Sequence, residues 1–191
     1  LSLLWPLQKP LHTASVLSPY LAVQMARSLH QMGVTSVGVK WPNDIYSDDK
    51  KLAGILIECV GEINGHCRMI IGVGLNVYMS QYMEVNIDQP WTDMVSEVPA
   101  HSIKRNQLAA IIITGIAETL DLFEQDKLNS LASEWQSWDV MKDKPVSILS
   151  EHGTKSGIAR GINNDGSLIL ETPVGKYENI LMGEISMRPS A

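Results

Sequence analysis

The sequence is poor in the residues that build disulfide frameworks and metal sites. Its 191 residues include two cysteines and five histidines. Cys59 and Cys67 form neither a CxxC motif nor a metal-ligand spacing, and no pair of histidines lies near them. We therefore predict two free thiols in a reducing cytosol and no metal site, with a disulfide as the less favoured alternative.

Positive charge and long apolar runs are also scarce. The 15 lysines and arginines are outnumbered by 21 acidic residues, which gives a net charge of -6, and no basic cluster is present. Because contacts with phosphates need clustered positive charge, this composition argues against a nucleic-acid surface in this portion. No apolar run approaches the roughly 18 residues that cross a bilayer, so we expect no membrane contact and a cytoplasmic protein.

The beginning of the chain lacks the features of a signal peptide. Residues 1–5, Leu-Ser-Leu-Leu-Trp, have no initiator methionine, no basic segment and no small-residue cleavage site. Their pattern is that of a strand that starts in mid-course. We therefore expect the chain to be a truncated form of a longer protein.

The chain does contain enough apolar residues for a core, at 45% of its length. Helical periodicity covers residues 18–32, where Ser18-Pro19 is a start signal and Gly33 is a stop signal. A second amphipathic helix is predicted over residues 107–124, with Asn106 as its cap. Both helices have one apolar face that can pack on a sheet.

Strand-like stretches account for much of the remaining sequence. Residues 1–7 form one, and three more cover residues 37–46, 52–60 and 68–77 with turn residues between them. This spacing predicts an antiparallel meander. Residues 78–101 are rich in turn residues and indicate a long loop or a broken helix.

The pattern changes after residue 143. Short strands at regular spacing, separated by Asp-Gly and Pro/Gly turns, predict a small β-barrel over residues 144–191. The expected fold class is α+β, with a mixed sheet and its helices over residues 1–143 and the barrel as a second domain.

The segment Lys40-Trp41-Pro42-Asn43-Asp44 is the first that can carry chemistry. A strand that meets proline loses a hydrogen bond of its ladder, so Asn43 and Asp44 follow at an irregular, exposed position. Pro-Asn-Asp is also good turn chemistry. Taken alone, the segment favours a strand-end turn, with Lys40 as a solvated charge and Trp41 as a core ring.

Two further segments are similarly ambiguous. Lys51, near the start of residues 50–56, can hold its ammonium over a pocket floor and bind a carboxylate or phosphate. The alternative is a lysine free in water at a hairpin tip. Taken alone, the segment favours this alternative because most lysines in proteins are exposed. The glycines of Gly72-Val73-Gly74-Leu75-Asn76 indicate either the close approach of a ligand or a β-bulge.

The order and spacing of the three segments are more informative than any one of them. KWPND, KLAGIL and GVGLN lie within one 37-residue stretch, and this series resembles the core of the biotin–protein ligases. The likeness extends from residues 1–5 to the barrel end at residues 183–188. It implies part of a class II synthetase-like catalytic domain followed by an SH3-like barrel.

The resemblance implies a two-step reaction. The family makes biotinyl-5′-AMP from biotin and MgATP, and then transfers biotin to one lysine of the biotin carboxyl carrier protein of acetyl-CoA carboxylase. By resemblance, Lys51 bridges the biotin carboxylate and the α-phosphate, where a preorganised cation stabilises the transition state. Asp44 is expected to orient the acceptor amine or to accept its proton.

The resemblance also assigns binding residues by position. Biotin is expected to contact Lys51, Leu56, Gly72 and Gly74. The adenylate or ATP is expected to contact Asn43, Asn76, Tyr82, Ile87, Trp91, Glu184 and Arg188. Three of these belong to a variable segment, 78–91, that would cover the adenylate and keep water from the mixed anhydride. A surface ion pair on the barrel is the alternative for Glu184 and Arg188.

The family's Gly- and Arg-rich biotin- and ATP-binding loop is not found in this sequence, so the chain alone is expected to have little or no ligase activity. Some members repress transcription through a further DNA-binding domain and form homodimers. The ligand-sensing and dimerising part of a biotin operon repressor, which would bind operator DNA only through that further domain, is therefore the main alternative. A lipoyl or octanoyl transferase is less favoured because it would lack the three segments. An SH3-like adaptor is weakened because the barrel lacks an aromatic groove.

Overall fold

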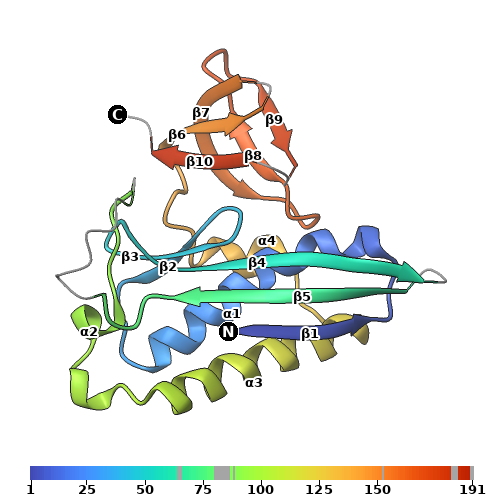
Figure 1. Ribbon diagram of the computed structural model, residues 1–191. Coiled ribbons are helices and arrows are strands. Elements are labelled where there is room, and N and C mark those ends of the chain that lie inside the picture. Colours follow the sequence, from blue (N-terminus) through green and yellow to red (C-terminus); the bar gives the residue numbers. More distant parts are fainter. Residues whose placement is uncertain (64–65, 80–86, 88, 152, 182–184, 190–191) are drawn as a thin grey trace.

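The computed structural model describes residues 1–63, 66–79, 87, 89–151, 153–181 and 185–189. It contains two five-stranded sheets. Helices lie against the first sheet, and the second sheet curls into a separate body beside it (Figure 1). This arrangement confirms the α+β class.

The first sheet has the strand order β1-β5-β4-β3-β2. Its strands are β1 (Ser2–Leu7), β2 (Val37–Lys40), β3 (Asp44–Ser47), β4 (Lys50–Ile63) and β5 (His66–Leu75). Each neighbouring pair is antiparallel, which confirms the meander.

The expectation of a mixed sheet is corrected to an antiparallel one. Parallel pairing among the described residues is limited to two isolated bridges, Val39 with Asp139 and Lys51 with Trp91. The physical reason is topological: β1 and β2 run in the same direction but occupy opposite edges of the sheet. The strands that are actually neighbours are joined by hairpins or paired antiparallel.

Three α-helices of six residues or more pack around this sheet within the described part of the chain. They are α1 (Leu17–Gln31), α3 (Arg105–Glu124) and α4 (Leu131–Gln136). The 3-10 helix η1 (Leu11–Val16) runs directly into α1, while the short α2 (Met94–Glu97) and η2 (Ala100–Ser102) precede α3. The predicted helix starts at Ser18 and Asn106 are wrong. Val16 precedes α1 and Lys104 precedes α3, and neither residue caps its helix with a side-chain hydrogen bond. For α1 the reason is that the chain is already helical in η1.

Helix α3 is long and apolar enough to cross a membrane, judged by length and composition alone. In the structure its apolar stripe is buried, and the helix packs against α1. The buried residues of this stripe include Leu108, Ile112, Ile116, Leu120 and Phe123. The helix is therefore part of the core beneath the sheet (Figure 1).

The second sheet has the order β10-β6-β7-β8-β9 and is antiparallel throughout. Its strands are β6 (Pro145–Ser150), β7 (Gly153–Ile162), β8 (Leu168–Glu171), β9 (Tyr177–Ile180) and β10 (Ile185–Pro189). We refer to it as the barrel.

The barrel is fixed to the first sheet and to α4 by specific contacts. The indole Nε1 of Trp41 donates a hydrogen bond of 2.9 Å to the backbone oxygen of Gly166, in the turn between β7 and β8. In the same turn, Asn164 Oδ1 accepts bonds from Ser130 Oγ and from the Ala132 backbone N–H, at the start of α4. These contacts hold the barrel over the strands that carry the KWPND segment.

Candidate functional site

The KWPND segment links β2 to β3 through an irregular turn, as predicted. Its Trp41–Pro42 peptide bond is cis. Asn43 makes two hydrogen bonds with Ile55 of β4. Its side-chain Nδ2 donates to the Ile55 backbone oxygen at 2.6 Å, and its backbone oxygen accepts from the Ile55 N–H at 3.0 Å. Trp41 is a core ring, as one interpretation had it, with 1% of its surface exposed.

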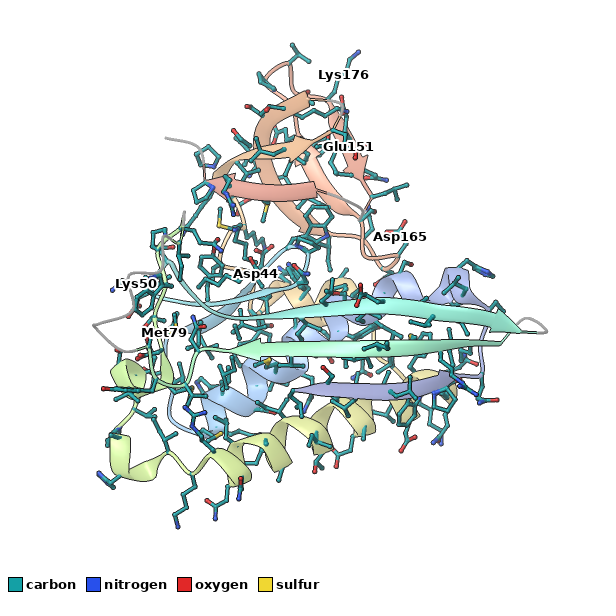
Figure 2. All side chains as sticks on the ribbon, in the orientation of Figure 1. Asp44, Lys50, Met79, Glu151, Asp165 and Lys176 are labelled. Carbon is teal, nitrogen blue, oxygen red and sulfur yellow. The ribbon has the colours of Figure 1, made fainter. Side chains whose placement is uncertain are left out.

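The Nζ atom of Lys51 lies 2.6 Å from Oδ1 of Asp44. Strands β3 and β4 bring the two residues together, and a register shift between Ile45 and Tyr46 lets Lys51 reach toward the Asp44 position. Figure 2 shows Asp44 between the first sheet and the barrel. The Lys51 side chain is 29% exposed, so the interpretation of a lysine free in water is wrong and its ammonium remains accessible.

Gly54 makes room for this ion pair, although sequence reasoning did not single it out. It pairs with Asp44 across the ladder. A Cβ atom at position 54 would lie 3.1 Å from Asp44 Oδ1 and 3.4 Å from Lys51 Nζ. The available signal was the small residue inside KLAGIL, at a strand position where a larger one would be expected.

Lys40 is a second cation beside Asp44, and the expectation of a solvated charge is wrong. It is 2% exposed, and its Nζ lies 4.0 Å from Asp44 Oδ2. The ammonium donates to Tyr46 Oη at 2.9 Å and lies over the ring of the same tyrosine. Burial lowers the pKa of Lys40 to about 8, against the opposing effect of Asp44, and burial also raises the pKa of Tyr46 to about 12.

Two adjoining hollows flank the Lys51 side chain. The first has a volume of about 450 Å³ and is lined in part by Asn43, Asp44, Leu56 and Gly72. The second, of about 410 Å³, is lined in part by Asn76, Ile87, Gln89 and Trp91. Both include Lys51, Gly54 and Gly74. Volumes of this size suit small ligands or parts of them.

The glycines of β5 leave the floor of these hollows open. The β4–β5 ladder is regular at Gly72 and Gly74, and its register shift lies elsewhere, between Val60 and Glu62. The β-bulge alternative is therefore wrong. A Cβ at Gly72 would meet nothing closer than 3.6 Å, and one at Gly74 nothing closer than 4.0 Å. Packing does not require glycine at either position, which favours the close approach of a ligand.

The far wall of the second hollow is fastened to Lys51 by its backbone. The Lys51 N–H donates to the Pro90 oxygen at 2.9 Å, and the Lys51 oxygen accepts from the Thr92 N–H at 3.0 Å. Asn76 Nδ2 donates to the oxygens of Lys51 and Thr92. The side-chain nitrogen of Asn76 thus stabilises this wall. The predicted role of Asn76 was a contact with the adenylate, and this structural role was not predicted.

Arg188 reaches this wall from the barrel. Its Nη1 donates to Gln89 Oε1 at 3.2 Å, and Tyr46 Oη donates to the same oxygen at 3.2 Å. Lys40, Tyr46 and Gln89 were not predicted as site residues. Tyr82 and Glu184, which were, lie outside the described residues.

The site gathers Lys40 and Lys51 beside the Asp44 carboxylate, and Arg188 joins them through Gln89 and Tyr46. Such an arrangement can bind an anion over an open backbone floor. Within the described part of the chain, no group of three or more His, Cys, Asp or Glu side chains is placed to hold a metal ion. Cys59 and Cys67 are both free thiols, which confirms that prediction.

Comparison with known proteins relates the chain to one family. The "Biotin/lipoate A/B protein ligase family" matches residues 1–76, and the "Biotin protein ligase C terminal domain" matches residues 143–188. "Bifunctional ligase/repressor BirA" of Escherichia coli (strain K12) is 36% identical over 188 residues, which are 98% of this chain and 58% of that protein. The chain thus spans less than two thirds of this relative.

Solved structures show the same fold. The apo structure of biotin protein ligase from Aquifex aeolicus superposes with a TM-score of 0.83 at 24% identity, and covers 99% of this chain and 82% of that one. A structure of the Aquifex aeolicus protein in complex with biotin and ATP has a TM-score of 0.79 at 23% identity, and covers 99% of this chain and 78% of that one. At these identities the likeness concerns the fold alone.

Proposed function

Because the chain belongs to the biotin protein ligase family, we propose that it carries the adenylate site of a biotin–[acetyl-CoA-carboxylase] ligase. In the first step a biotin carboxylate oxygen attacks the α-phosphorus of MgATP, and pyrophosphate leaves. In the second step the lysine amine of a biotin carboxyl carrier protein attacks the mixed anhydride. That amine loses a proton and AMP leaves.

The observation that carries the proposal is the partly exposed Lys51 ammonium, held by Asp44 at 2.6 Å beside the glycine floor. The two hollows meet at Lys51, so a ligand that fills both must pass its central atoms over this cation. Biotinyl-AMP places its acyl phosphate in that position when biotin fills the Gly72 side and the nucleotide fills the Trp91 side. A preorganised ammonium there stabilises the developing negative charge.

The remaining roles follow from position. Leu56, Gly72 and Gly74 would contact biotin, and Ile87 and Trp91 would cover the nucleotide. Arg188 would contact phosphate from the barrel. Asn43 and Asp44 stand at the edge of the first hollow, where an incoming carrier lysine can be oriented and deprotonated. We place the boundary between catalytic domain and barrel near residue 143, and the working location in the cytoplasm.

Calorimetric titration of the chain with biotinyl-AMP tests the proposal without requiring ATP to be bound. One-to-one saturable binding is expected, and Lys51→Ala should abolish it. Lys50→Ala is the matched control, because Lys50 is an exposed neighbour and should bind like the wild type. Absence of binding by the wild type, or full binding by Lys51→Ala, would contradict the proposal.

A second candidate function is ligand-dependent pairing of two copies, as in a biotin operon repressor. It is favoured by the edge of β4: β3 pairs with β4 only as far as Gly54, and Leu56 and Val60 beyond it are 58% and 51% exposed. A strand edge of this kind can pair with another chain. Sedimentation with and without biotinyl-AMP separates the cases, since only the repressor role requires ligand-dependent dimers.

A further inference from the structure

One side-chain atom connects the barrel to the first sheet at the site. Gln89 Oε1 accepts a hydrogen bond from Tyr46 Oη and another from Arg188 Nη1, each at 3.2 Å. An amide oxygen has two lone pairs, and both are used here. The two donors come from different sheets, and Gln89 lies 99 residues from Arg188 in sequence.

The chemistry of the partners fixes the direction of each bond. Arginine only donates, so the Gln89 atom that faces it must be the oxygen. Tyr46 must then donate to that oxygen, which leaves a lone pair on its hydroxyl to accept from Lys40 at 2.9 Å. Asp44 continues the series, with Lys40 at 4.0 Å from one of its oxygens and Lys51 at 2.6 Å from the other.

This series of contacts is shielded from water in its middle. Tyr46 is 6% exposed and Lys40 is 2% exposed. Polar contacts in such surroundings are stronger than in water, and a partner that is lost cannot be replaced freely by solvent. A change at one end is therefore expected to affect the other end.

We propose that Gln89 is a positioning residue that couples Arg188 to Lys51, so that the barrel and the first sheet hold an anionic ligand as one unit. The inference rests on the proposed function, because the ligand is taken to be biotinyl-AMP. Gln89 acts in two ways: its side chain accepts from Arg188 and Tyr46, and its neighbour Pro90 accepts from the Lys51 backbone. Removing Arg188 should therefore remove its direct contact with the ligand and also make the position of Lys51 less well defined.

A double-mutant cycle in the biotinyl-AMP titration tests the coupling. Tyr46→Phe removes only a hydroxyl, and Arg188→Ala removes the barrel's cation. Each single change should weaken binding by roughly fivefold or more, since each removes at least one hydrogen bond. The double variant should bind clearly more tightly than the product of the two effects predicts. In a Gln89→Leu background the coupling should vanish, and Tyr46→Phe should have little further effect.

A spectroscopic measurement separates positioning from general support of the fold. The NMR signal of the Arg188 guanidinium should shift in Tyr46→Phe, two side chains away. It should not shift in Tyr177→Phe, which changes an exposed tyrosine of the barrel.

Each outcome of these experiments has one meaning. If the wild type binds and Lys51→Ala does not, but the effects of Tyr46→Phe and Arg188→Ala simply multiply, the coupling is refuted while the proposed function stands. If the wild type does not bind biotinyl-AMP, the proposed function fails and the inference fails with it.

Discussion

Lys51 Nζ and Asp44 Oδ1 lie 2.6 Å apart next to Gly54, where a Cβ atom would lie within 3.4 Å of both side chains. The pair is two residues from adjacent strands whose side chains converge because of one register shift. Its geometry therefore depends on a residue that contributes no functional group of its own.

Gly54→Ala is predicted to weaken binding of biotinyl-AMP by about tenfold or more. A Cβ atom would lie 3.1 Å from Asp44 Oδ1, and a misplaced charge near the reacting atoms is costly. Calorimetry measures the affinity, and circular dichroism checks that the variant is folded. Unchanged affinity in a folded variant would show that the ion pair tolerates displacement.

Gly74→Ala is predicted to separate binding from stability. The added methyl meets no atom closer than 4.0 Å, so the free energy of unfolding should stay equal or rise by about 0.5 kcal/mol through reduced chain entropy. Affinity for biotinyl-AMP should fall, because the methyl occupies the floor. Gly38→Ala is the opposite control: its methyl would overlap Val140 and the Trp138 oxygen, so urea denaturation should show a loss of about 2 kcal/mol. A destabilised Gly74→Ala would contradict the open floor.

Lys40 predicts a pH dependence of stability with a defined sign. Its pKa is about 8 in the folded protein against 10.5 as a free side chain, so between these values the unfolded chain binds more protons and stability rises with pH. Lys40→Met lacks this titration. From pH 8 to pH 10 the wild type should gain about 2 kcal/mol relative to Lys40→Met.

Urea denaturation at several pH values measures that difference. The comparison with Lys40→Met is needed because two other groups act in the opposite direction. The pKa values of Tyr46 and Cys59 are raised, to about 12 and about 11, so the stability that these groups contribute to the folded protein falls as the pH rises. Parallel curves for the two proteins would mean that Lys40 keeps an ordinary pKa.

Trp41→Phe is predicted to lower the free energy of unfolding by about 1–3 kcal/mol. A smaller aromatic ring remains, and the Gly166 oxygen loses its donor in a buried place. Urea denaturation gives the value. Trp138→Phe is a suitable comparison, because Trp138 is only partly buried and should cost less; equal losses would argue against a specific role for the Trp41 hydrogen bond.

Sequence periodicity predicted the elements that depend on local pattern. Helix α1, helix α3 and the meander of β3, β4 and β5 were predicted because one apolar face repeats at a fixed spacing. The helix starts were wrong because η1 continues into α1, which no cap residue signals. The direction of strand pairing at the sheet edges depends on topology, so the mixed sheet was wrong.

Most of the site residues that could be predicted from the sequence belong to the three motif segments. Lys51 and Asp44 were named from the motif series, and the structure brings them together. Gln89, Tyr46 and Lys40 were missed because each looks ordinary in its own segment. Their roles arise from convergence of β2, β3, the segment before α2 and the barrel, which no spacing within one segment can reveal.

The three cations of the site, Lys40, Lys51 and Arg188, lie in a protein whose net charge is -6. An anionic ligand is therefore repelled at long range and attracted once it is near the two hollows beside Lys51. Salt screens charges beyond a Debye length of about 8 Å at physiological ionic strength, and it affects partly buried groups less. Moderate salt should thus speed the association of an anionic ligand before higher salt weakens its binding, which is the reverse of electrostatic steering by a uniformly cationic surface.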